Sequence, residues 1–335
     1  MENDDESSRS SGSSNHSNTE ELEEPTIEAV QIAARKALNP DHDIACRRFA
    51  EGTHHAVYAI GDDHVARCLP ISEKAIKSLR RDGAVQNLAK RSMSKPDIVS
   101  EVLETPLIVD GWQGNLERRL HGICLQDSQP TAKTEADLAQ LLIDLRAVDV
   151  GEALAATAYQ ESKVNIKARV GKTIRAWEEL VQKGHAVDPE AKLSSMLKEK
   201  LEGLSKVSEG LYQPALLHAD INTENVLVDP KDGSITGVLD WSDAFVGDPC
   251  VEFSGVIFAI GVEGARRVGE KVGLSAVEIE RGWLYTMTEM IRDLRKCLCG
   301  EKRDEHLTML LKGEWGRVFE GTGFEGLLRS ERSAA

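Results

Sequence analysis

The stretch LLHADINTENVLVDPKDGSITGVLDWSDAFVGDP, residues 216–249, limits the possible folds of this chain more than any other part of the sequence. Two short apolar runs, at 226–228 and 235–239, flank a turn-forming run that contains Pro and Gly, and this pattern predicts a β-hairpin. Asn225 enters the first strand and Asp240 leaves the second, so both lie at the open end of the hairpin. Paired strands lie about 5 Å apart, so one oxygen from each side chain can reach a single cation.

Asp220 precedes the first of these strands, on a loop that is free to approach whatever the cation holds. Mg²⁺ suits such a site, because it takes oxygen ligands and usually keeps phosphate and water among them. An Asp followed five residues later by Asn, and then by an Asp after a hairpin, is the arrangement that kinases use. There the first Asp orients the attacking hydroxyl, and the other two residues hold magnesium on the nucleotide phosphates. The spacing therefore predicts that Asp220 is catalytic and that Asn225 and Asp240 bind metal.

The same stretch resembles the aminoglycoside phosphotransferase family, whose fold is similar to that of protein kinases. The positions that match the family pattern H-G-D-x-x-x-x-N, D-W and G-D-P are His218, Asp220, Asn225, Asp240-Trp241 and Gly247-Asp248-Pro249. Ala219 stands where the family usually has Gly, and Glu252 stands where an Asp usually follows the G-D-P. The resemblance implies a two-lobed α+β fold, ATP and Mg²⁺ as cofactors, and transfer of a phosphoryl group to a small-molecule hydroxyl.

Each of these residues also has a structural interpretation. His218 is a second catalytic candidate; its structural interpretation, which the resemblance implies, is that it braces the loop through hydrogen bonds. Asp248 is expected to be a turn residue, and Asp243 could cap a loop. For Asp220, Asn225 and Asp240 the alternative is ordinary surface polarity in turns, but three independent positions agree with one site.

The first part of the chain predicts a small antiparallel sheet with helices beside it. A helix is expected over 26–38, and strands within 44–69 are separated by turns near Gly52 and at 61–63. A second helix is expected over 73–90, and a strand over 98–109 would finish the sheet. In the family that the chain resembles, the first turn covers the nucleotide phosphates, which makes Gly52 a candidate for nucleotide binding.

Further nucleotide-binding candidates follow from the same resemblance. Arg67, in VARCLP, matches the basic residue of the third strand that meets the phosphates, and Lys74 and Lys77 are alternative cations. Asp82 stands where the family generally has a Glu paired with that strand cation. Asp is one methylene shorter than Glu, but a pair between Asp82 and Arg67 is expected.

Residues 115–122 resemble the family's hinge between the lobes, whose backbone binds the adenine edge. This segment makes Leu116 and Arg118 candidates for nucleotide binding, although Arg118 stands where the family usually has Glu. We therefore place the boundary between a nucleotide-binding lobe, 25–118, and a mainly helical catalytic and substrate lobe, 119–328.

Beyond the hinge, apolar residues recur at helical spacing, and we expect their stripes to be core. Helices are predicted over 134–148, 164–182, 190–204, 251–262 and 283–298, and within 305–328. Thr134-Glu135-Ala136-Asp137 resembles a capping box at the start of the first of these helices. Glu263, Glu289 and Asp293 could line the acceptor cleft, or they could lie on solvated helix faces.

The N-terminal segment is acidic and rich in Ser. Residues 1–24 hold eight acidic residues against one Arg, and so account for −7 of the formal net charge of −15. Such a segment buries too little apolar surface to offset the entropy of ordering, so we predict a disordered tail over 1–24, and a flexible end over 329–335. The remaining −8 repels nucleic-acid phosphates and is compatible with a cationic or neutral small substrate.

The cysteines and the apolar runs predict a cytoplasmic protein. The six cysteines form no C-x-x-C pair, and reduced thiols are the simplest account of them. Cys297-x-Cys299 has no second pair to complete a metal site. No apolar run approaches the roughly 18 residues of a membrane helix, and the N-terminus lacks the apolar core of a signal peptide. The sequence does not indicate an oligomeric state.

Two other functions stay open. A kinase-like protein that binds nucleotide or acts as a scaffold without turnover would explain Asp82, Arg118 and the single Gly of the first turn. A metal-dependent hydrolase would use His218, Asp220 and Asp240 as ligands, but this reading leaves Asn225 and the Arg67 strand unexplained. The acceptor is equally open, because aminoglycosides, choline-like amino alcohols, sugars and homoserine-like molecules are served by similar folds.

Overall fold

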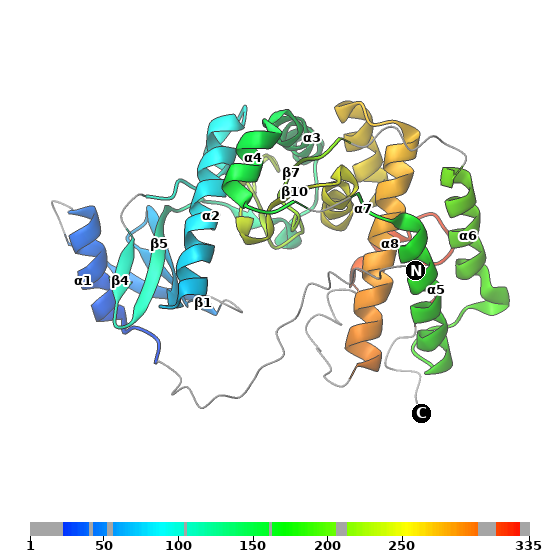
Figure 1. The fold of residues 1–335 in the computed structure, drawn as a ribbon, viewed down its shortest axis with the longest axis horizontal. Coiled ribbons are helices and arrows are strands. Elements are labelled where there is room, and N and C mark those ends of the chain that lie inside the picture. Colours follow the sequence, from blue (N-terminus) through cyan, green and yellow to red (C-terminus); the bar gives the residue numbers. More distant parts are fainter. Residues whose placement is uncertain are drawn as a thin grey trace, which may run out of the picture.

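A computed structural model describes residues 23–39, 43–51, 56–103, 106–160, 163–205, 213–300 and 313–328. Outside this part of the chain lie residues 1–22 of the predicted tail, the turn that contains Gly52, residues 305–312 of the last predicted helix, and the predicted flexible end at 329–335. The described residues form the two-lobed α+β architecture that the sequence predicts, with a small sheet lobe and a larger, mainly helical lobe (Figure 1).

The smaller lobe contains a five-stranded antiparallel sheet in the order β1-β2-β3-β5-β4. Its strands are β1 (Cys46–Glu51), β2 (Ala56–Ile60), β3 (His64–Pro70), β4 (Leu107–Val109) and β5 (Trp112–Arg118). The first three strands agree with the prediction for residues 44–69. The strand predicted over 98–109 is wrong in its length, because only its last three residues form β4.

The physical reason lies in the route of the chain before β4. Pro96 lacks a backbone N–H and opens a short 3₁₀ helix, Pro96–Ile98. Val99 then bridges to Val238 of the larger lobe, and Val102 bridges to Glu117 of β5. The segment after residue 98 thus connects the lobes before it joins the sheet.

Two helices flank this sheet, α1 (Ile27–Leu38) and α2 (Glu73–Ser92), and the sheet lies between them in Figure 1. The chain just before α1 is held on the sheet. The Trp112 indole N–H donates to the Glu23 carbonyl at 3.0 Å, and Glu24 forms an ion pair with Arg48 at 3.0 Å. Glu23 and Glu24, which the sequence places in the tail, therefore contact the smaller lobe.

The predicted hairpin is confirmed. It consists of β8 (Val226–Val228) and β9 (Ile235–Val238), which pair antiparallel with Val226 opposite Val238. The strand β6 (Ile123–Cys124), which follows the hinge, joins them in the order β6-β8-β9. Beside this sheet, β7 (Ala215–Leu217) pairs with β10 (Phe245–Gly247). These two small sheets carry the segment that the sequence singled out.

Six labelled helices build the rest of the described part of the larger lobe. They are α3 (Ala132–Ala147), α4 (Val150–Thr157), α5 (Ile166–Gln182), α6 (Lys192–Ser205), α7 (Pro249–Val272) and α8 (Ala276–Cys299). The sequence did not predict α4, and it predicted α8 too short. The helix predicted over 251–262 corresponds to the part of α7 before Gly261, whose φ and ψ are not helical. The capping box of α3 also starts earlier than predicted, with Thr131 as the N-cap and Thr134 as its partner.

The apolar stripes of these helices form one large core, as predicted. Trp177 of α5 stacks on Trp315 with ring centroids 5.5 Å apart, and Phe319 stacks on Trp315 at 4.0 Å. Residues 313–318 are helical and close this core from the C-terminal side. Among the helices that the structure describes, none combines the length and apolar composition that a bilayer span requires.

Candidate active site

His218 follows β7 and is fully buried. Its Nδ1 accepts a hydrogen bond from the Asp220 N–H at 3.3 Å, so Nε2 carries the proton and donates to the Leu239 carbonyl at 2.8 Å. Burial lowers the pKa of His218 to about 4, which keeps the ring neutral. This geometry fits the bracing role expected for His218 and leaves neither ring nitrogen for proton transfer or for a metal.

Ala219 turns the chain between His218 and Asp220 with φ +66°, in the left-handed region that favours glycine. The conformation costs an L-residue about 1–2 kcal/mol, which explains why a Gly is usual here in the family that the chain resembles. The Ala219 N–H donates to Glu252 of α7 at 3.1 Å. Glu252 is almost fully buried, and burial raises its pKa to about 7. A buried carboxyl group of α7 therefore supports the catalytic loop through a hydrogen bond.

Two amides fix the carboxylate of Asp220. Asn225 Nδ2 donates to Oδ2 at 2.7 Å, and also to the Asp220 carbonyl at 3.0 Å. Asn222 Nδ2 donates to Oδ1 at 3.1 Å. Burial, with the charges of Asp243 and Asp240, raises the pKa of Asp220 to about 6. The two carboxylates at 220 and 240 thus lie within electrostatic range of each other, as the predicted site requires.

Asn222 is a site residue that the sequence reasoning missed. Its Oδ1 accepts hydrogen bonds from the backbone N–H groups of Glu224 and Asn225, each at 2.9 Å. An Asn that bonds the backbone two residues on forms an Asx turn. The preference of Asn for this turn could have identified residue 222 from the sequence, but the family pattern leaves the residues between Asp220 and Asn225 unspecified.

Asp240 leaves β9 with φ +59°, so it also occupies the left-handed region. Its Oδ1 accepts from Arg67 Nη2 at 3.0 Å and from Ser242 Oγ at 2.8 Å. Burial would raise the pKa of Asp240, but the charge of Arg67 and these hydrogen bonds outweigh it and hold the pKa below its usual value. The structure thus brings the predicted phosphate cation of β3 directly to a predicted metal ligand.

The pair predicted between Arg67 and Asp82 is not among the ion pairs of the described residues. Arg67 pairs instead with Asp240 and, at 3.9 Å, with Glu117 of β5. Asp82 is buried, its Oδ1 accepts no hydrogen bond within the described part, and it forms an ion pair with Arg81 at 3.8 Å. Burial raises its pKa to about 6, although the charges of Arg67 and Arg81 oppose this rise. Asp82 is thus within electrostatic range of Arg67 without forming an ion pair with it.

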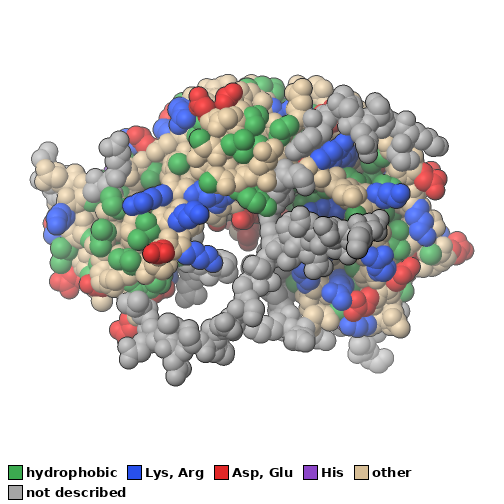
Figure 2. Space-filling view, in the orientation of Figure 1, with side chains coloured by type: hydrophobic (Ala, Val, Ile, Leu, Met, Phe, Trp, Pro, Cys, Tyr) green, Lys and Arg blue, Asp and Glu red, His purple; other side chains and the backbone are tan. Residues whose placement is uncertain are grey.

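Glu117 could have been found from the sheet pattern. Arg67 lies opposite Asn115 in the β3–β5 pair, so Glu117 is its diagonal neighbour on the same face. Lys74 and Lys77, the alternative cations, are exposed on α2 and take part in no ion pair of the described residues. Figure 2 shows Lys and Arg side chains gathered over this helix.

The backbone groups of the two hinge candidates are engaged inside the smaller lobe. The Leu116 carbonyl accepts from the Leu103 N–H at 2.8 Å. The Arg118 N–H donates to the Glu101 carbonyl at 2.9 Å, and the Arg118 carbonyl accepts from Ser100 Oγ at 2.6 Å. A carbonyl can accept a second hydrogen bond, so the adenine-binding role of Leu116 and Arg118 stays a prediction.

The acidic residues considered for the acceptor cleft lie in ion pairs on helix faces. Glu263 pairs with Arg266, Glu289 with Arg169 and Arg292, and Asp293 with Arg292 and Lys296. A carboxylate that is closer to the catalytic loop is Glu314, which Thr223 hydrogen-bonds. Burial raises the pKa of Glu314 to about 7. The sequence analysis missed Glu314 because it did not assign a helix with a defined buried face within residues 305–328.

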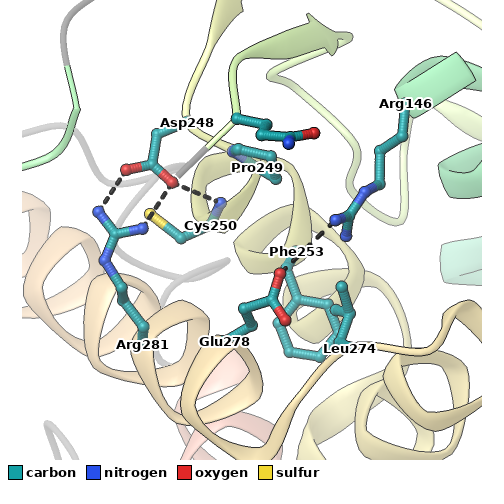
Figure 3. A pocket seen from close by; sticks show the side chains of 9 residues that line it. Arg146, Asp248, Pro249, Cys250, Phe253, Leu274, Glu278 and Arg281 are labelled. Atoms are coloured by element: carbon teal, nitrogen blue, oxygen red, sulfur yellow. Dashed lines mark hydrogen bonds and ion pairs between the residues drawn. The ribbon is translucent and has the colours of Figure 1, made fainter. Parts of the chain in front are cut away.

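Figure 3 shows a small cavity behind the catalytic loop, where α7 begins. Asp248 caps α7 and forms a two-pronged ion pair with Arg281, and Arg146 pairs with Glu278 at 3.5 Å. The cavity measures about 30 Å³, far below the ~300–1,000 Å³ of small-molecule sites. Asp248 therefore has the structural role that the sequence suggested, although as a helix cap.

Comparison with known proteins adds to this geometry. The model of the phosphotransferase enzyme family matches residues 45–283, which include the hairpin, the catalytic loop and most of the smaller lobe. The chain belongs to this family. The resemblance inferred from the motifs is thereby confirmed. No curated protein matches this phosphotransferase-family chain.

Solved aminoglycoside phosphotransferases share the fold of this family member. The GDP complex of aminoglycoside 2'-phosphotransferase-IIIa is 19% identical, covers 85% of this chain and 98% of its own, and superposes with a TM-score of 0.58. The streptomycin–ATP ternary complex of APH(2")-IIa is 16% identical, with coverages of 85% and 95% and a TM-score of 0.53. At such identities the likeness concerns the fold alone.

The donor set of this site fits Mg²⁺ better than it fits a hydrolase metal. Asn225 and Asp240 offer an amide and a carboxylate oxygen, the hard ligands that Mg²⁺ takes. His218, which a zinc or manganese site would need, has both ring nitrogens bonded to backbone groups. Within the described ranges, no three His, Cys, Asp or Glu side chains gather as a metal cluster.

Proposed function

We propose that this chain transfers the γ-phosphoryl group of ATP to a hydroxyl group of a small molecule. One observation carries the proposal. Asp220 is bonded to Asn225 at 2.7 Å, at the mouth of the hairpin where Asp240 meets Arg67 at 3.0 Å. A proton acceptor, two oxygen ligands and a phosphate cation, from three separate segments, thus meet at one place, and family membership favours phosphotransfer as their shared purpose.

Asp220 orients the acceptor hydroxyl and takes its proton. Its pKa of about 6 leaves it ionised at neutral pH, yet makes it a stronger base than a solvated Asp. Asn225 and Asp240 would hold Mg²⁺, which neutralises charge on the nucleotide phosphates. Arg67 steadies the same phosphates. Because phosphoryl transfer passes through a loose transition state, positioning and charge neutralisation supply most of the rate.

Asp220→Asn tests this assignment. We expect turnover to fall by at least 10³-fold, since an amide cannot take a proton, while the stabilisation of the protein by Mg²⁺-ATP in a thermal shift assay stays close to that of the wild type. Asp97→Asn, the same change at an exposed position, is the matched control and should keep full turnover. Equal loss of turnover and nucleotide binding in Asp220→Asn would show that Asp220 is structural.

The acceptor is identified by screening purified protein and Mg²⁺-ATP against a metabolite library that includes aminoglycosides, amino alcohols and sugars.

A second candidate function is nucleotide binding without turnover. It is supported by the ion pair of Arg67 with Asp240, because this pair holds the predicted phosphate-binding cation against a predicted metal ligand. Stabilisation by Mg²⁺-ATP with no ATP consumption across the library would favour it. Location in the cytoplasm stays a prediction from the free cysteines.

A further inference from the structure

Arg81, on α2, donates hydrogen bonds from all three guanidinium nitrogens to backbone carbonyls of the larger lobe. Nε donates to the Thr157 carbonyl at 3.0 Å, Nη1 to the Ser242 carbonyl at 2.6 Å, and Nη2 to the Ala244 carbonyl. Only Arg presents several donors in one rigid plane. Such a contact therefore fixes the position of each carbonyl relative to the other two.

The carbonyls of Ser242 and Ala244 belong to the turn between Asp240 and β10. Asp240 opens this turn in the left-handed region, a conformation that persists only where its surroundings hold it. Ser242 contributes on both sides of the turn: its carbonyl accepts from Arg81, while its hydroxyl donates to Asp240 Oδ1 at 2.8 Å. Arg81 thus supports, from behind, the residue that directs the Asp240 carboxylate.

The third carbonyl connects Arg81 to the sheet beneath the catalytic loop. Thr157 ends α4, and the Tyr159 carbonyl just after it accepts from the Val246 N–H of β10 at 3.2 Å. β10 pairs with β7, which leads directly into His218. One side chain from α2 therefore supports both the turn of Asp240 and the strand pair that carries the catalytic loop.

We infer that Arg81 is a positioning residue which couples α2 to the Asp240 turn, so that Mg²⁺-dependent nucleotide binding depends on it. Among the described residues, Arg81 forms no hydrogen bond or ion pair with Asn225 or Asp240; its ion pair is with Asp82 at 3.8 Å, and it acts on Asp240 through Ser242. The inference rests on the proposed function, because it assumes that Asp240 binds Mg²⁺.

The test uses Arg81→Met and Arg81→Lys in the full chain, with Arg80→Met as the matched control. Arg80 is the exposed neighbour on α2 and takes part in no ion pair of the described residues. The thermal shift produced by ADP is measured as Mg²⁺ is titrated. We expect the half-saturating Mg²⁺ concentration to rise at least tenfold in Arg81→Met, to rise less in Arg81→Lys, and to match the wild type in Arg80→Met.

A merely structural role would lower the melting temperature of the ligand-free protein without moving the Mg²⁺ midpoint, and that result would overturn the inference. Should Arg81→Met fail to fold, Arg81→Lys decides the question, because it keeps the charge but not the planar fork. A wild-type protein that shows no Mg²⁺-dependent stabilisation by ADP would overturn the proposed function, and the inference with it. A wild-type response that all variants share would overturn the inference alone.

Discussion

The carboxylate of Asp220 lies between two amides, and each fixes one of its oxygens. Its charge state at working pH is the balance of opposing effects. Burial and the nearby acids raise its pKa, while the hydrogen bonds from Asn222 and Asn225 lower it. Because Asn225 is also a predicted metal ligand, Asn222 is the residue through which this balance can be changed while both predicted ligand side chains are kept, although its Oδ1 also accepts from the Asn225 N–H.

Asn222→Ala should therefore move the pH dependence of turnover. In the wild type, kcat/KM is expected to fall as the pH drops through about 6, where Asp220 becomes protonated. Loss of the Asn222 donor removes a contact that favours the charged form, so the pKa of Asp220 rises and the acidic limb moves to higher pH. Asn87→Ala, at an exposed position on α2, serves as the control. An acidic limb that stays in place in Asn222→Ala would contradict this account.

The residues that carry the proposed chemistry follow from spacing in the sequence, and those that support them do not. The placement of Asp220, Asn225 and Asp240 was predictable because it depends on their order along one hairpin and its loop, while their roles stay predictions. Glu117 and Arg81 act across elements far apart in the sequence, so only the packing of β3 on β5 and of α2 on the larger lobe reveals them. In place of the predicted pair with Asp82, Arg67 pairs with Asp240 and Glu117, and sequence order alone does not reveal this choice of partners.

Helix α7 packs directly against the catalytic loop. Gly255 permits this approach, because a Cβ at that position would lie 2.7 Å from the Ile221 carbonyl oxygen. The obstacle is backbone, which cannot rotate away as a side chain could. The position of the loop that holds Asp220 therefore depends on the absence of a side chain at residue 255 of α7.

Gly255→Ala should displace the loop. We expect it to lower turnover by more than tenfold and to destabilise the protein by about 1–3 kcal/mol, as overpacking does. Gly171→Ala is the matched control, since a Cβ on that α5 glycine meets nothing within 4 Å, and Ala should stabilise the helix by up to about 1 kcal/mol. Turnover assays and chemical denaturation measure both effects. Equal behaviour of the two variants would show that the close approach is unimportant.

Elements with a long periodic pattern, or with a clear turn signal, were predicted well. Helices α5 and α6 follow from apolar spacing, and the hairpin follows from two short apolar runs on either side of a turn-forming run. α4 spans eight residues, too few to establish a period, and it was missed. The helix predicted over 251–262 ends where Gly261 leaves helical geometry, with φ +78° and ψ 170°, and a second helical segment, which the pattern did not predict, continues α7 to Val272.

For the molecule as a whole, buried carboxyl groups link stability to pH. Glu252 is 3% exposed, and its pKa is raised from 4.5 to about 7. A group whose folded pKa is raised stabilises the fold fully below its unfolded value, and this contribution is lost as the pH rises through the folded value. Ionising Glu252 in the folded protein therefore costs about 3 kcal/mol. The backbone hydrogen bonds from Ala219 and His218 offset only part of the cost of burying the charge.

Glu252→Gln removes this dependence while keeping an oxygen for the loop. Between about pH 5 and pH 8, the free energy of unfolding of the wild type should fall relative to that of the variant, by up to about 3 kcal/mol. Urea denaturation at both pH values measures the difference, with Glu263→Gln, on an exposed part of α7, as control. Parallel pH profiles for the wild type and Glu252→Gln would contradict the assignment.

The fastening of α2 bears on how the two lobes can move. Besides Arg81, Lys95 Nζ just beyond its end donates to the Ile235 carbonyl at 2.6 Å, and the Ser94 N–H donates to Asp144 at 2.7 Å. A helix fastened in this way belongs mechanically to the larger lobe, although its sequence places it in the smaller one. We therefore expect that any rearrangement which separates the five-stranded sheet from α2 must first break the hydrogen bond from Asn115 Nδ2 to the Leu79 carbonyl.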